Sequence, residues 1–324
     1  MKKWIALWLL ISVLCACGTA NAHDPWILKY SSHGEAGSII ELTASAFNGA
    51  VINGTDDNIE LEIYQDGALG DLDAVLSSIT GKSGAIDAAS LPDDALIALG
   101  CDALKVLNAP YLFRDDAHLK SFLKTTLVQT IQEQIQPKKE GLSALALLDA
   151  GFYGFALRES AEHLEGLAIA VPDEAGMPDL VRALGGEPVI LDRQGAIDAL
   201  RAGAVDGMEA TLEQYDAYGL SDCAPFFLQD HHRLNVYVIV MGGETWSRAL
   251  NRERKQLLEA GQYAMDFCTK FRSNREVKYL EAMADAGVTL ISADPAALKD
   301  RCQSVIQQII RGNEALYREI TNVQ

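Results

Sequence analysis

The chain has 324 residues, of which 49% are hydrophobic and 22% charged, so it is too apolar to be disordered and long enough for two domains. Acidic residues outnumber basic ones by 45 to 27, which gives a formal net charge of -18. Because so acidic a chain repels phosphates, this balance argues against binding to nucleic acid.

Residues 1–22 are predicted to be an export signal. Two lysines precede an apolar run over residues 4–16, which is too short to cross a bilayer but has the length of a signal-peptide core. The small residues Ala-Asn-Ala at 20–22 predict cleavage before His23. An alternative lipobox, Leu-Cys-Ala-Cys, would make Cys17 the acylated first residue. We therefore expect a periplasmic protein, either free or lipid-anchored, and no later segment is apolar over the length of a membrane helix.

Four cysteines follow the signal: Cys101, Cys223, Cys268 and Cys302. An even number permits disulfides in an oxidising compartment, but their wide spacing and the size of the core do not require them. Buried free thiols are an equally open interpretation. There is no Cys-x-x-Cys motif, which argues against a zinc-ribbon or thioredoxin-like site.

The first half of the chain alternates strand and helix patterns. A strand at 26–30 is followed by helical spacing at 35–47, a strictly alternating strand at 59–64, a helix at 72–79 and a short strand at 85–89. Such a βαβαβ order predicts a parallel sheet covered by helices.

The second half repeats this alternation. The expected strands are 144–148, 167–171, 188–191 and 235–241, and the expected helices are 178–184, 196–202, 245 to roughly 286, and 295–321. Two α/β units joined by returning strands predict hinged domains with a cleft between them. We assign residues 23–149 and 236–276 to domain I, and residues 150–235 and 277–324 to domain II.

Five sequence blocks resemble one family in order and spacing. They are Asp-Gly-Ala-Leu-Gly-Asp at 66–71, Gly-Ala-Ile-Asp at 84–87, Ala-Pro-Tyr-Leu-Phe-Arg-Asp at 109–115, the block from His163 to Pro172, and the block from Ala199 to Glu209. Together they resemble the solute-binding subunit of TRAP transporters, the DctP type, over nearly the whole chain.

The resemblance implies an α/β periplasmic-binding-protein (flytrap) fold of two domains with a long bracing helix. Its expected role is that of a monomer that delivers a small-molecule solute to the small and large membrane subunits of a sodium-driven importer. No catalysis and no cofactor are expected.

The residues that hold the ligand carboxylate in the resembling family are absent from this chain. The family arginine before Val-Pro is replaced by Ala170, a second arginine falls on or near Tyr153, and the family asparagine after the Asp-Gly-x-Glu block is Ala210. An alanine cannot hold a carboxylate, and a buried anion without a partner costs several kcal/mol. We therefore expect a small polar solute that is neutral or cationic.

Other polar residues follow predicted strands, at the edge where open α/β sheets bind ligands. The candidates are His33, Glu35, Ser90, Asp173 and Glu209, together with Glu174 beside Asp173. Asp173 and Glu174 have an alternative as caps of the next helix. Glu209 has an alternative as a structural residue of the family block.

Arg193 offers a relocated anion site, or is a surface residue. It keeps open a second ligand class, an organic acid. A further alternative is a protein that presents its ligand to a sensor kinase.

Aromatic and histidine residues complete the candidates. Tyr153 and Tyr215 offer ring faces to a cation, whereas Phe152 and Tyr237 are expected in the core. Adjacent histidines at 231 and 232 point to opposite faces of an extended chain and are a poor metal site, so no metal is expected. The chain also lacks the nucleophile-elbow, zincin and phosphate-loop motifs of common enzymes.

The strand at 167–171 carries a geometric prediction. The family match places the side chain of Ala170 at the cleft, and those of Ile169 and Val171 then pack on helices.

Overall fold

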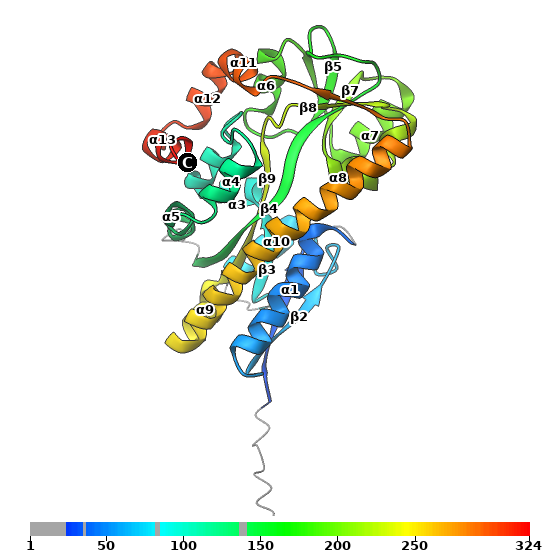
Figure 1. Ribbon diagram of the computed structural model, residues 1–324. Coiled ribbons are helices and arrows are strands. Elements are labelled where there is room, and N and C mark those ends of the chain that lie inside the picture. Colours follow the sequence, from blue (N-terminus) through cyan, green and yellow to red (C-terminus); the bar gives the residue numbers. More distant parts are fainter. Residues whose placement is uncertain (1–23, 35–36, 82–84, 136–140) are drawn as a thin grey trace, which may run out of the picture.

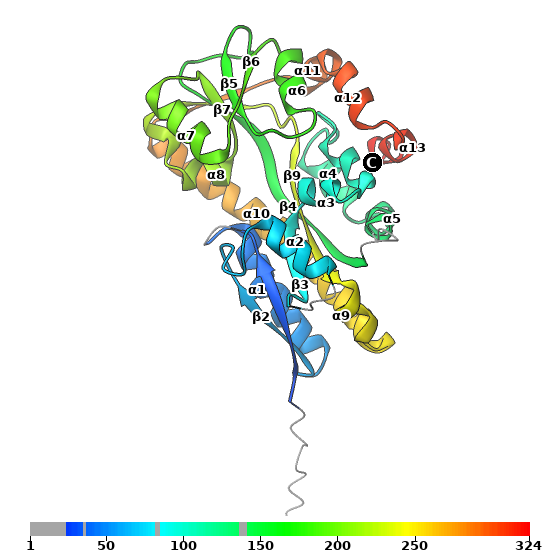
Figure 2. The same cartoon turned by 180° about the vertical axis from the view of Figure 1, so that it is seen from behind.

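The computed structural model describes residues 24–34, 37–81, 85–135 and 141–324. The predicted signal segment, Cys17 and Glu35 lie outside these ranges. Two lobes are joined by strands and one long helix (Figures 1 and 2). A mixed ten-stranded sheet runs through both lobes in the order β2-β1-β3-β9-β4-β7-β5-β6, with β8 and β10 branching from β4. The predicted two-domain α/β architecture is confirmed.

The first lobe has the predicted βαβαβ order. Its elements are β1 (Trp26–Ser32), α1 (Ile39–Gly54), β2 (Ile59–Tyr64), α2 (Leu72–Thr80) and β3 (Ala88–Pro92). The strands β2 and β3 both pair in parallel with β1. Strand β3 begins at Ala88, later than the predicted Ala85, because the Asp87 carboxylate accepts hydrogen bonds from Lys29 and Thr245 just before the strand.

Short helices fill the segment between β3 and β4, where no helix was predicted. They are α3 (Asp93–Ala98), the 3-10 helix η1 (Asp102–Asn108), α4 (Asp116–Phe122) and α5 (Thr126–Gln134). Asp115 caps α4 by accepting a hydrogen bond from the His118 amide, as short polar side chains do at helix starts. Each of these helices has fewer than ten residues, too few for a clear helical period.

Strand β4 (Leu142–Leu157) connects the two lobes and is far longer than the predicted 144–148. It pairs antiparallel with β9 (Leu234–Gly242) and then with β7 (Gly207–Thr211). The register shifts between Asp149 and Phe152, where Gly151 has a φ of 97°. The sequence pattern ends at Leu148 because this irregularity interrupts it.

The second lobe continues with helices on both faces of the sheet. In chain order it contains β5 (Ala168–Val171), α6 (Met177–Ala183), β6 (Glu187–Ile190), α7 (Arg193–Ala202), β7, α8 (Leu212–Ala217), the 3-10 helix η2 (Leu220–Asp222) and β8 (Phe226–Gln229). The predicted strands and helices between 167 and 202 are confirmed within a residue or three at each end. Strands β7 and β8 were not predicted.

The C-terminal region contains α9 (Gly243–Arg248), α10 (Asn251–Asp285), β10 (Thr289–Ser292), α11 (Pro295–Arg301), α12 (Gln303–Ile309) and α13 (Glu314–Thr321). The predicted helix 245–286 is broken at Leu250, whose backbone is extended and whose amide donates to Glu253. The predicted helix 295–321 is wrong as one helix. It is three short helices, and Gly312 with a φ of 85° lies in the second break.

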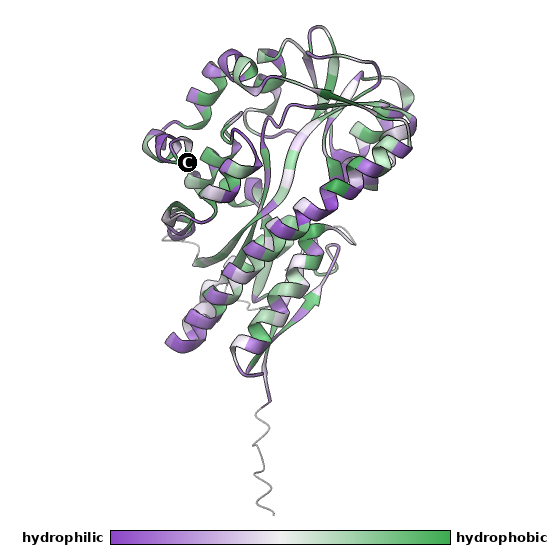
Figure 3. Ribbon diagram, in the orientation of Figure 1, coloured by the Kyte–Doolittle hydropathy of each residue, from purple (hydrophilic) through white to green (hydrophobic). Residues whose placement is uncertain are grey.

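Helix α10 is the bracing helix that the family resemblance implied. Its 35 residues run along both lobes and pack on α1 and β4 (Figure 1). One face is hydrophilic and points away from the sheet (Figure 3). Arg272 fixes the helix to the sheet by donating to Asp149 of β4 at 2.8 Å and to Asp116 of α4.

The four cysteines after the signal are free thiols, and all except Cys223 are buried. The disulfide alternative is therefore not realised in this structure. Across the described ranges, no helix combines the length and the apolar character that a membrane span requires.

Candidate functional site

A buried arginine lies between β8 and β9, beside β4. Arg233 is 7% exposed; its Nε and Nη2 donate to the two carboxylate oxygens of Glu209 at 2.6 and 2.8 Å, and its Nη1 donates to Glu174 at 2.7 Å. Its guanidinium carbon lies 4.2 Å from the centre of the Tyr153 ring. Side chains of this chain therefore occupy all three nitrogens of the arginine fork.

His232 extends this network. Its Nε2 lies 2.9 Å from Glu209 and its Nδ1 lies 2.8 Å from Asp230, whose other oxygen accepts from the Tyr111 hydroxyl at 2.8 Å. Burial favours the neutral imidazole, but the two carboxylates raise the pKa of His232 to about 9. Burial likewise opposes ionisation of Glu209, but Arg233 and His232 hold its pKa at about 2. Glu209 and His232 are therefore both ionised at neutral pH, whereas burial raises the pKa of Glu174 above its usual value despite Arg233.

Two cavities lie where the lobes meet. The first has a volume of about 290 Å³ and is bounded by the segment after β1, the starts of α7 and α8, strand β9 and helix α10. Its charged lining comprises Arg193, Arg275, Glu213 and Asp216, with His33 beside them. Arg275 lies 3.5 Å from Glu213. The first cavity thus presents both signs of charge.

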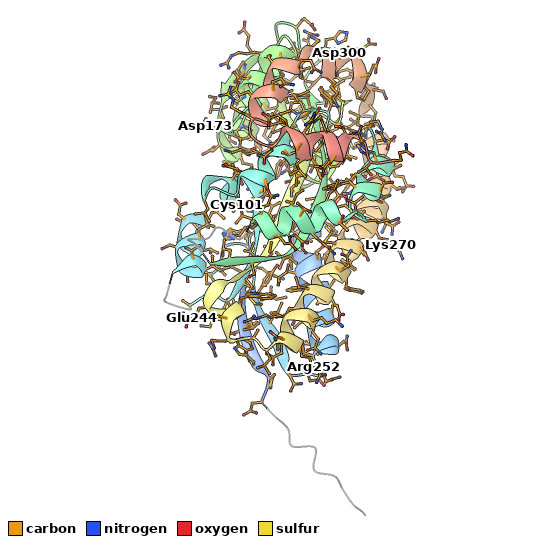
Figure 4. All side chains as sticks on the ribbon, turned by 90° about the vertical axis from the view of Figure 1, so that its left-hand side faces the viewer. Cys101, Asp173, Glu244, Arg252, Lys270 and Asp300 are labelled. Carbon is orange, nitrogen blue, oxygen red and sulfur yellow. The ribbon has the colours of Figure 1, made fainter. Side chains whose placement is uncertain are left out.

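The second cavity has a volume of about 470 Å³. It lies between α3 and η1 on one side and the segment joining β5 to α6 on the other, with α12 nearby. Figure 4 shows Asp173 at the edge of the molecule, above the segment that carries Cys101. The cavity combines acids with apolar residues: Asp94, Asp173, Glu174, Ile97, Pro110, Met177, Leu180 and Ile309, together with Asn108, Lys105 and Arg233.

Asp93 and Asn108 carry oxygens that the described chain leaves without partners. The Asp93 side chain is buried and its Oδ2 has no hydrogen-bond donor among the described residues. Burial raises the pKa of Asp93 to about 7; Arg233 and a hydrogen bond to the Asn108 side chain oppose the rise, and Asp94 and Glu174 add to it. The Oδ1 of Asn108, which lines the second cavity, is also buried without a partner in those ranges.

Among the predicted site residues of the first lobe, His33 lines the first cavity. Burial lowers its pKa, against the attraction of Asp66. Ser90 is fully buried beside Ser32, its register partner across β1 and β3. The hydroxyls of both serines are unpartnered within the described part of the chain. Glu35 lies outside the described residues.

The three positions that the sequence predicts to depart from the family's carboxylate-binding pattern fall in two settings. Ala170 and Ala210 are 1% and 0% exposed and pack with residues of α7 in the core of the second lobe. Tyr153 lies against Arg233. The prediction that Ala170 faces the cleft is therefore wrong, because α7 covers that side of β5. Ile169 and Val171 belong to the other core cluster, so the predicted alternation along this strand is correct.

The alternative role of Asp173 and Glu174 as helix caps is wrong. Helix α6 starts after Gly176, whose φ is 91°, and no side chain caps it. The Glu174 side chain is instead bonded to Arg233, and Asp173 is exposed at the second cavity. Glu209, the family-block acid, lies in the buried network. The structure thus brings Glu174 and Glu209 together, with Asp173 nearby in the sequence.

Arg193 and the aromatic candidates are also placed. Arg193 is exposed at the start of α7 and lines the first cavity. Phe152 is in the core as predicted, whereas Tyr237 lines the first cavity. Tyr215 is in the core, where it donates to the Ala224 carbonyl oxygen.

The adjacent histidines take different partners. The ring of His231 stacks on Phe152, whereas His232 is held by carboxylates. No group of three or more His, Cys, Asp or Glu side chains in the described ranges has the arrangement of a metal site.

Sequence reasoning missed Arg233, Asp93, Asn108 and Tyr111. One signal for Arg233 was present: it ends the polar run Asp-His-His-Arg at 230–233, directly before a strand of nine residues that is largely buried. Charged residues so close to a core strand are buried only when they are paired.

Comparison with known proteins identifies the fold and the family. The sequence model of the bacterial extracellular solute-binding proteins, family 7 (DctP), matches residues 30–313. The chain belongs to this family. It is therefore a DctP-type TRAP solute-binding protein, a member of a transport family and not of an enzyme family.

Relatives agree with this assignment. The sialic acid-binding periplasmic protein SiaP of Vibrio cholerae is 20% identical over 308 residues, which cover 93% of each chain. A TRAP periplasmic solute-binding protein of Pseudomonas putida F1, solved with D-glucuronate, is similar with a TM-score of 0.82 and 20% identity, covering 92% of this chain and 98% of that one. A protein of Xanthobacter autotrophicus Py2, solved with β-D-galacturonate, has a TM-score of 0.81 and 20% identity, over 92% and 100% of the chains. These structures support the flytrap fold.

Proposed function

We propose that this DctP-type protein binds a small polar organic solute, neutral or cationic, at the junction of its lobes. It would work in the periplasm as a monomer and present the solute to the small and large membrane subunits of a sodium-coupled TRAP importer. Closure of the lobes around the solute would exclude water and produce the form that the membrane subunits recognise.

The state of Arg233 is the observation that supports this ligand class most. An arginine binds a carboxylate through two parallel N–H donors. In Arg233 one such pair is bonded to Glu209, and the remaining nitrogen is bonded to Glu174. A ligand carboxylate at this arginine would lie next to the Glu209 and Glu174 carboxylates.

The charge of the whole network also favours a neutral or cationic solute. Three carboxylates, those of Glu174, Glu209 and Asp230, contact only two cations, Arg233 and His232. An incoming anion would increase the excess of negative charge in a buried setting, where Coulomb interactions are strong. A neutral or cationic solute avoids that cost.

Two buried alanines also support this ligand class. Ala170 and Ala210 stand where the resembling family has an arginine and an asparagine, and neither has a side-chain donor. Both are buried against α7. The usual carboxylate partners are therefore not replaced at those two positions.

An organic acid is the second candidate, because Arg193 and Arg275 line the first cavity. The relatives are also named or solved with acids, namely sialic acid, D-glucuronate and β-D-galacturonate. In this arrangement the acid would bind near Arg193, away from Arg233.

A ligand screen distinguishes the two. Residues 23–324 would be purified, stripped of ligand by partial unfolding, refolded, and screened by thermal shift against amines, amino alcohols, zwitterions, neutral polyols and carboxylates. A binder at 100 times its Kd stabilises the fold by about 2.7 kcal/mol. Stabilisation by amines or neutral polar compounds, confirmed by calorimetry, supports the proposal.

Micromolar binding of D-glucuronate, sialic acid or a C4-dicarboxylate, lost in Arg193→Gln and kept in the surface variant Arg252→Gln, would overturn it in favour of the acid. Arg252 is a suitable control because it is highly exposed, and its guanidinium is paired with Asp56 on the surface.

A further inference from the structure

The second cavity differs chemically from the first. Its walls are apolar, with Ile97, Pro110, Met177, Leu180 and Ile309 contributing carbon surface, and its acids are Asp94, Asp173 and Glu174. Apolar walls with a few polar groups are typical of a pocket for a small organic molecule. Here three acids line the cavity together with two basic residues, Lys105 and Arg233.

The two basic residues at this cavity already have partners. The Lys105 ammonium lies 2.6 Å from Asp102, one helical turn away, and Asp102 is not among the cavity residues. Arg233 is bonded to Glu209 and Glu174. Neither of these basic side chains is therefore paired with Asp94 or Asp173.

Some hydrogen-bond acceptors at or near the second cavity also lack donors. Asp93 is 6% exposed and interacts electrostatically with Asp94, Glu174 and Arg233, three residues that line the cavity. Its Oδ2 and the Oδ1 of Asn108 have no donor in the described ranges. Buried acceptors without donors are costly in a folded protein. A ligand with N–H groups in the cavity would satisfy the Asn108 oxygen, which lines it, and a positive charge there would be attracted by Asp93.

We propose that the second cavity receives the cationic group of the solute, an organic ammonium ion with apolar substituents. The ammonium is held by Asp94 and Asn108, with Asp93 as its buried counter-ion, and the substituents lie against the apolar walls. This inference rests on the proposed function, and it assigns the ligand class and the place where the charge binds.

The first cavity does not offer the same setting. Arg193 and Arg275 face it together with Glu213 and Asp216, so acids and bases are balanced there. Its acid Glu213 accepts from the Ile39 amide and from the Tyr279 hydroxyl, both at 3.1 Å.

Binding is tested with defined probes, benzylammonium and benzyltrimethylammonium, against neutral benzyl alcohol of similar shape. Calorimetry at pH 8 would compare the full mature chain with Asp94→Asn and Asn108→Leu. Each variant is expected to weaken binding of benzylammonium by about fivefold to tenfold, the size of one charge-assisted hydrogen bond. Benzyltrimethylammonium has no N–H to donate, so Asp94→Asn should weaken its binding through the lost charge, whereas Asn108→Leu should leave it nearly unchanged. Binding of benzyl alcohol is expected to be weaker than that of the cations in the parent and unchanged in Asp94→Asn.

Asp216→Asn is the matched control, because it removes the same charge from the first cavity. Melting temperatures of the unliganded variants establish that they fold. If Asp216→Asn weakens the cations and Asp94→Asn does not, the assignment to the second cavity is overturned, while the proposed ligand class stands. If neither cation binds but a neutral polyol does, the ammonium assignment is overturned and the proposed function again stands.

A second measurement needs no ligand. Ala98 and Ala217 are both exposed, and they line the second and first cavity respectively. Each would be changed to cysteine, and its reaction rates with a cationic and an anionic methanethiosulfonate reagent compared. The ratio of cationic to anionic rate is expected to be at least about fivefold higher at Ala98→Cys than at Ala217→Cys, because acids concentrate cations locally. Equal ratios would overturn the proposal.

Discussion

At the scale of single residues, Asp93 links the site to stability. Its pKa of about 7 lies far above the value near 3.9 of an unfolded aspartate. Between pH 4 and pH 7 the unfolded chain has lost this proton while the folded chain keeps it. The residue therefore lowers the free energy of unfolding as the pH rises through this window, and its effect is constant above pH 7.

Asp93→Asn is accordingly expected to be more stable than the parent at pH 8. The gain is at most about 4 kcal/mol, from about three pKa units at 1.36 kcal/mol each, and it shrinks toward zero at pH 4. Denaturant unfolding of both proteins at pH 4, 6 and 8 measures it. Asp94→Asn, at an exposed neighbour, is the control and should change little. A parent as stable as Asp93→Asn at pH 8 would contradict the prediction.

Positions 169 and 170 give a second prediction, which the structure has changed. The sequence predicted that residue 170 faces the cleft, where an introduced arginine would be tolerated, and that residue 169 packs on helices, where it would not. Because both sides of β5 are buried, Ala170→Arg and Ile169→Arg are each expected to destabilise the fold by several kcal/mol through burial of an unpaired charge. Melting temperatures compare them. A melting temperature of Ala170→Arg close to that of the parent would restore the original cleft-facing orientation.

Part of the site was predictable residue by residue. His33, Asp173 and Arg193 line cavities because they follow strands of an α/β sheet, and sequence order alone identifies that edge. Asp93 also follows a strand, β3, and Arg233 ends a polar run before one, but position alone does not show that either is buried. Their importance comes from burial and from partners distant in sequence, such as Glu209 and Glu174, and no local spacing encodes such pairs.

At the scale of elements, helix α10 depends on a close approach to β4. A β-carbon added at Gly261 would lie 2.2 Å from the Leu145 carbonyl oxygen, closer than side chains can approach without backbone movement. Gly49 in α1 has no neighbour within 4 Å of such a carbon. Gly261 thus lies against the backbone of β4, whereas Gly49 has open space around it.

Gly261→Ala is therefore expected to destabilise the protein by about 1–3 kcal/mol, the cost of overpacking. Gly49→Ala is expected to stabilise it by about 0.5–1 kcal/mol, since alanine is the better helix former. Chemical denaturation of the two variants beside the parent tests this pair. A Gly261→Ala variant as stable as Gly49→Ala would mean that α10 does not pack against β4 so closely.

The sequence predicted the elements with a clear pattern, including β9 and most of α10 across the lobe junction, and it missed elements that are short or interrupted. Strands β1 and β2 have clear patterns and were found. Strand β4 was cut at Leu148 because its path bends at Gly151, and β8 and β10 have only four residues each. Their pairing with each other and with β4 is set by tertiary contacts, which outweigh local propensity in strands.

At the scale of the whole molecule, β4, β9 and α10 run between the lobes, and α12 contacts both α6 and η1. The buried charge network lies beside β4 and β9. Tyr111 reaches Asp230 from the segment before α4, and Glu174 reaches Arg233 from the segment after β5. The network therefore ties segments far apart in sequence to the strands that cross the lobe junction. Movement of Glu174 toward a bound cation would be transmitted to these strands.

The net charge supplies a prediction about association. Cleavage before His23 would remove Lys2 and Lys3 and change the formal charge from -18 to -20. A strongly acidic protein attracts cations over a range set by the Debye length, about 10 Å at 0.1 M salt and about 30 Å at 0.01 M. The association rate of benzyltrimethylammonium, followed by stopped-flow tryptophan fluorescence, is therefore expected to fall as sodium chloride rises from 0.01 to 0.3 M. The dissociation rate should change much less, because it depends on contacts inside the closed site.

Benzyl alcohol is the uncharged control, and its association rate should be independent of salt. An association rate for the cation that stays constant or rises with salt would contradict long-range attraction, and a D-glucuronate association rate that rises with salt would instead be the signature of an anion entering against the same field.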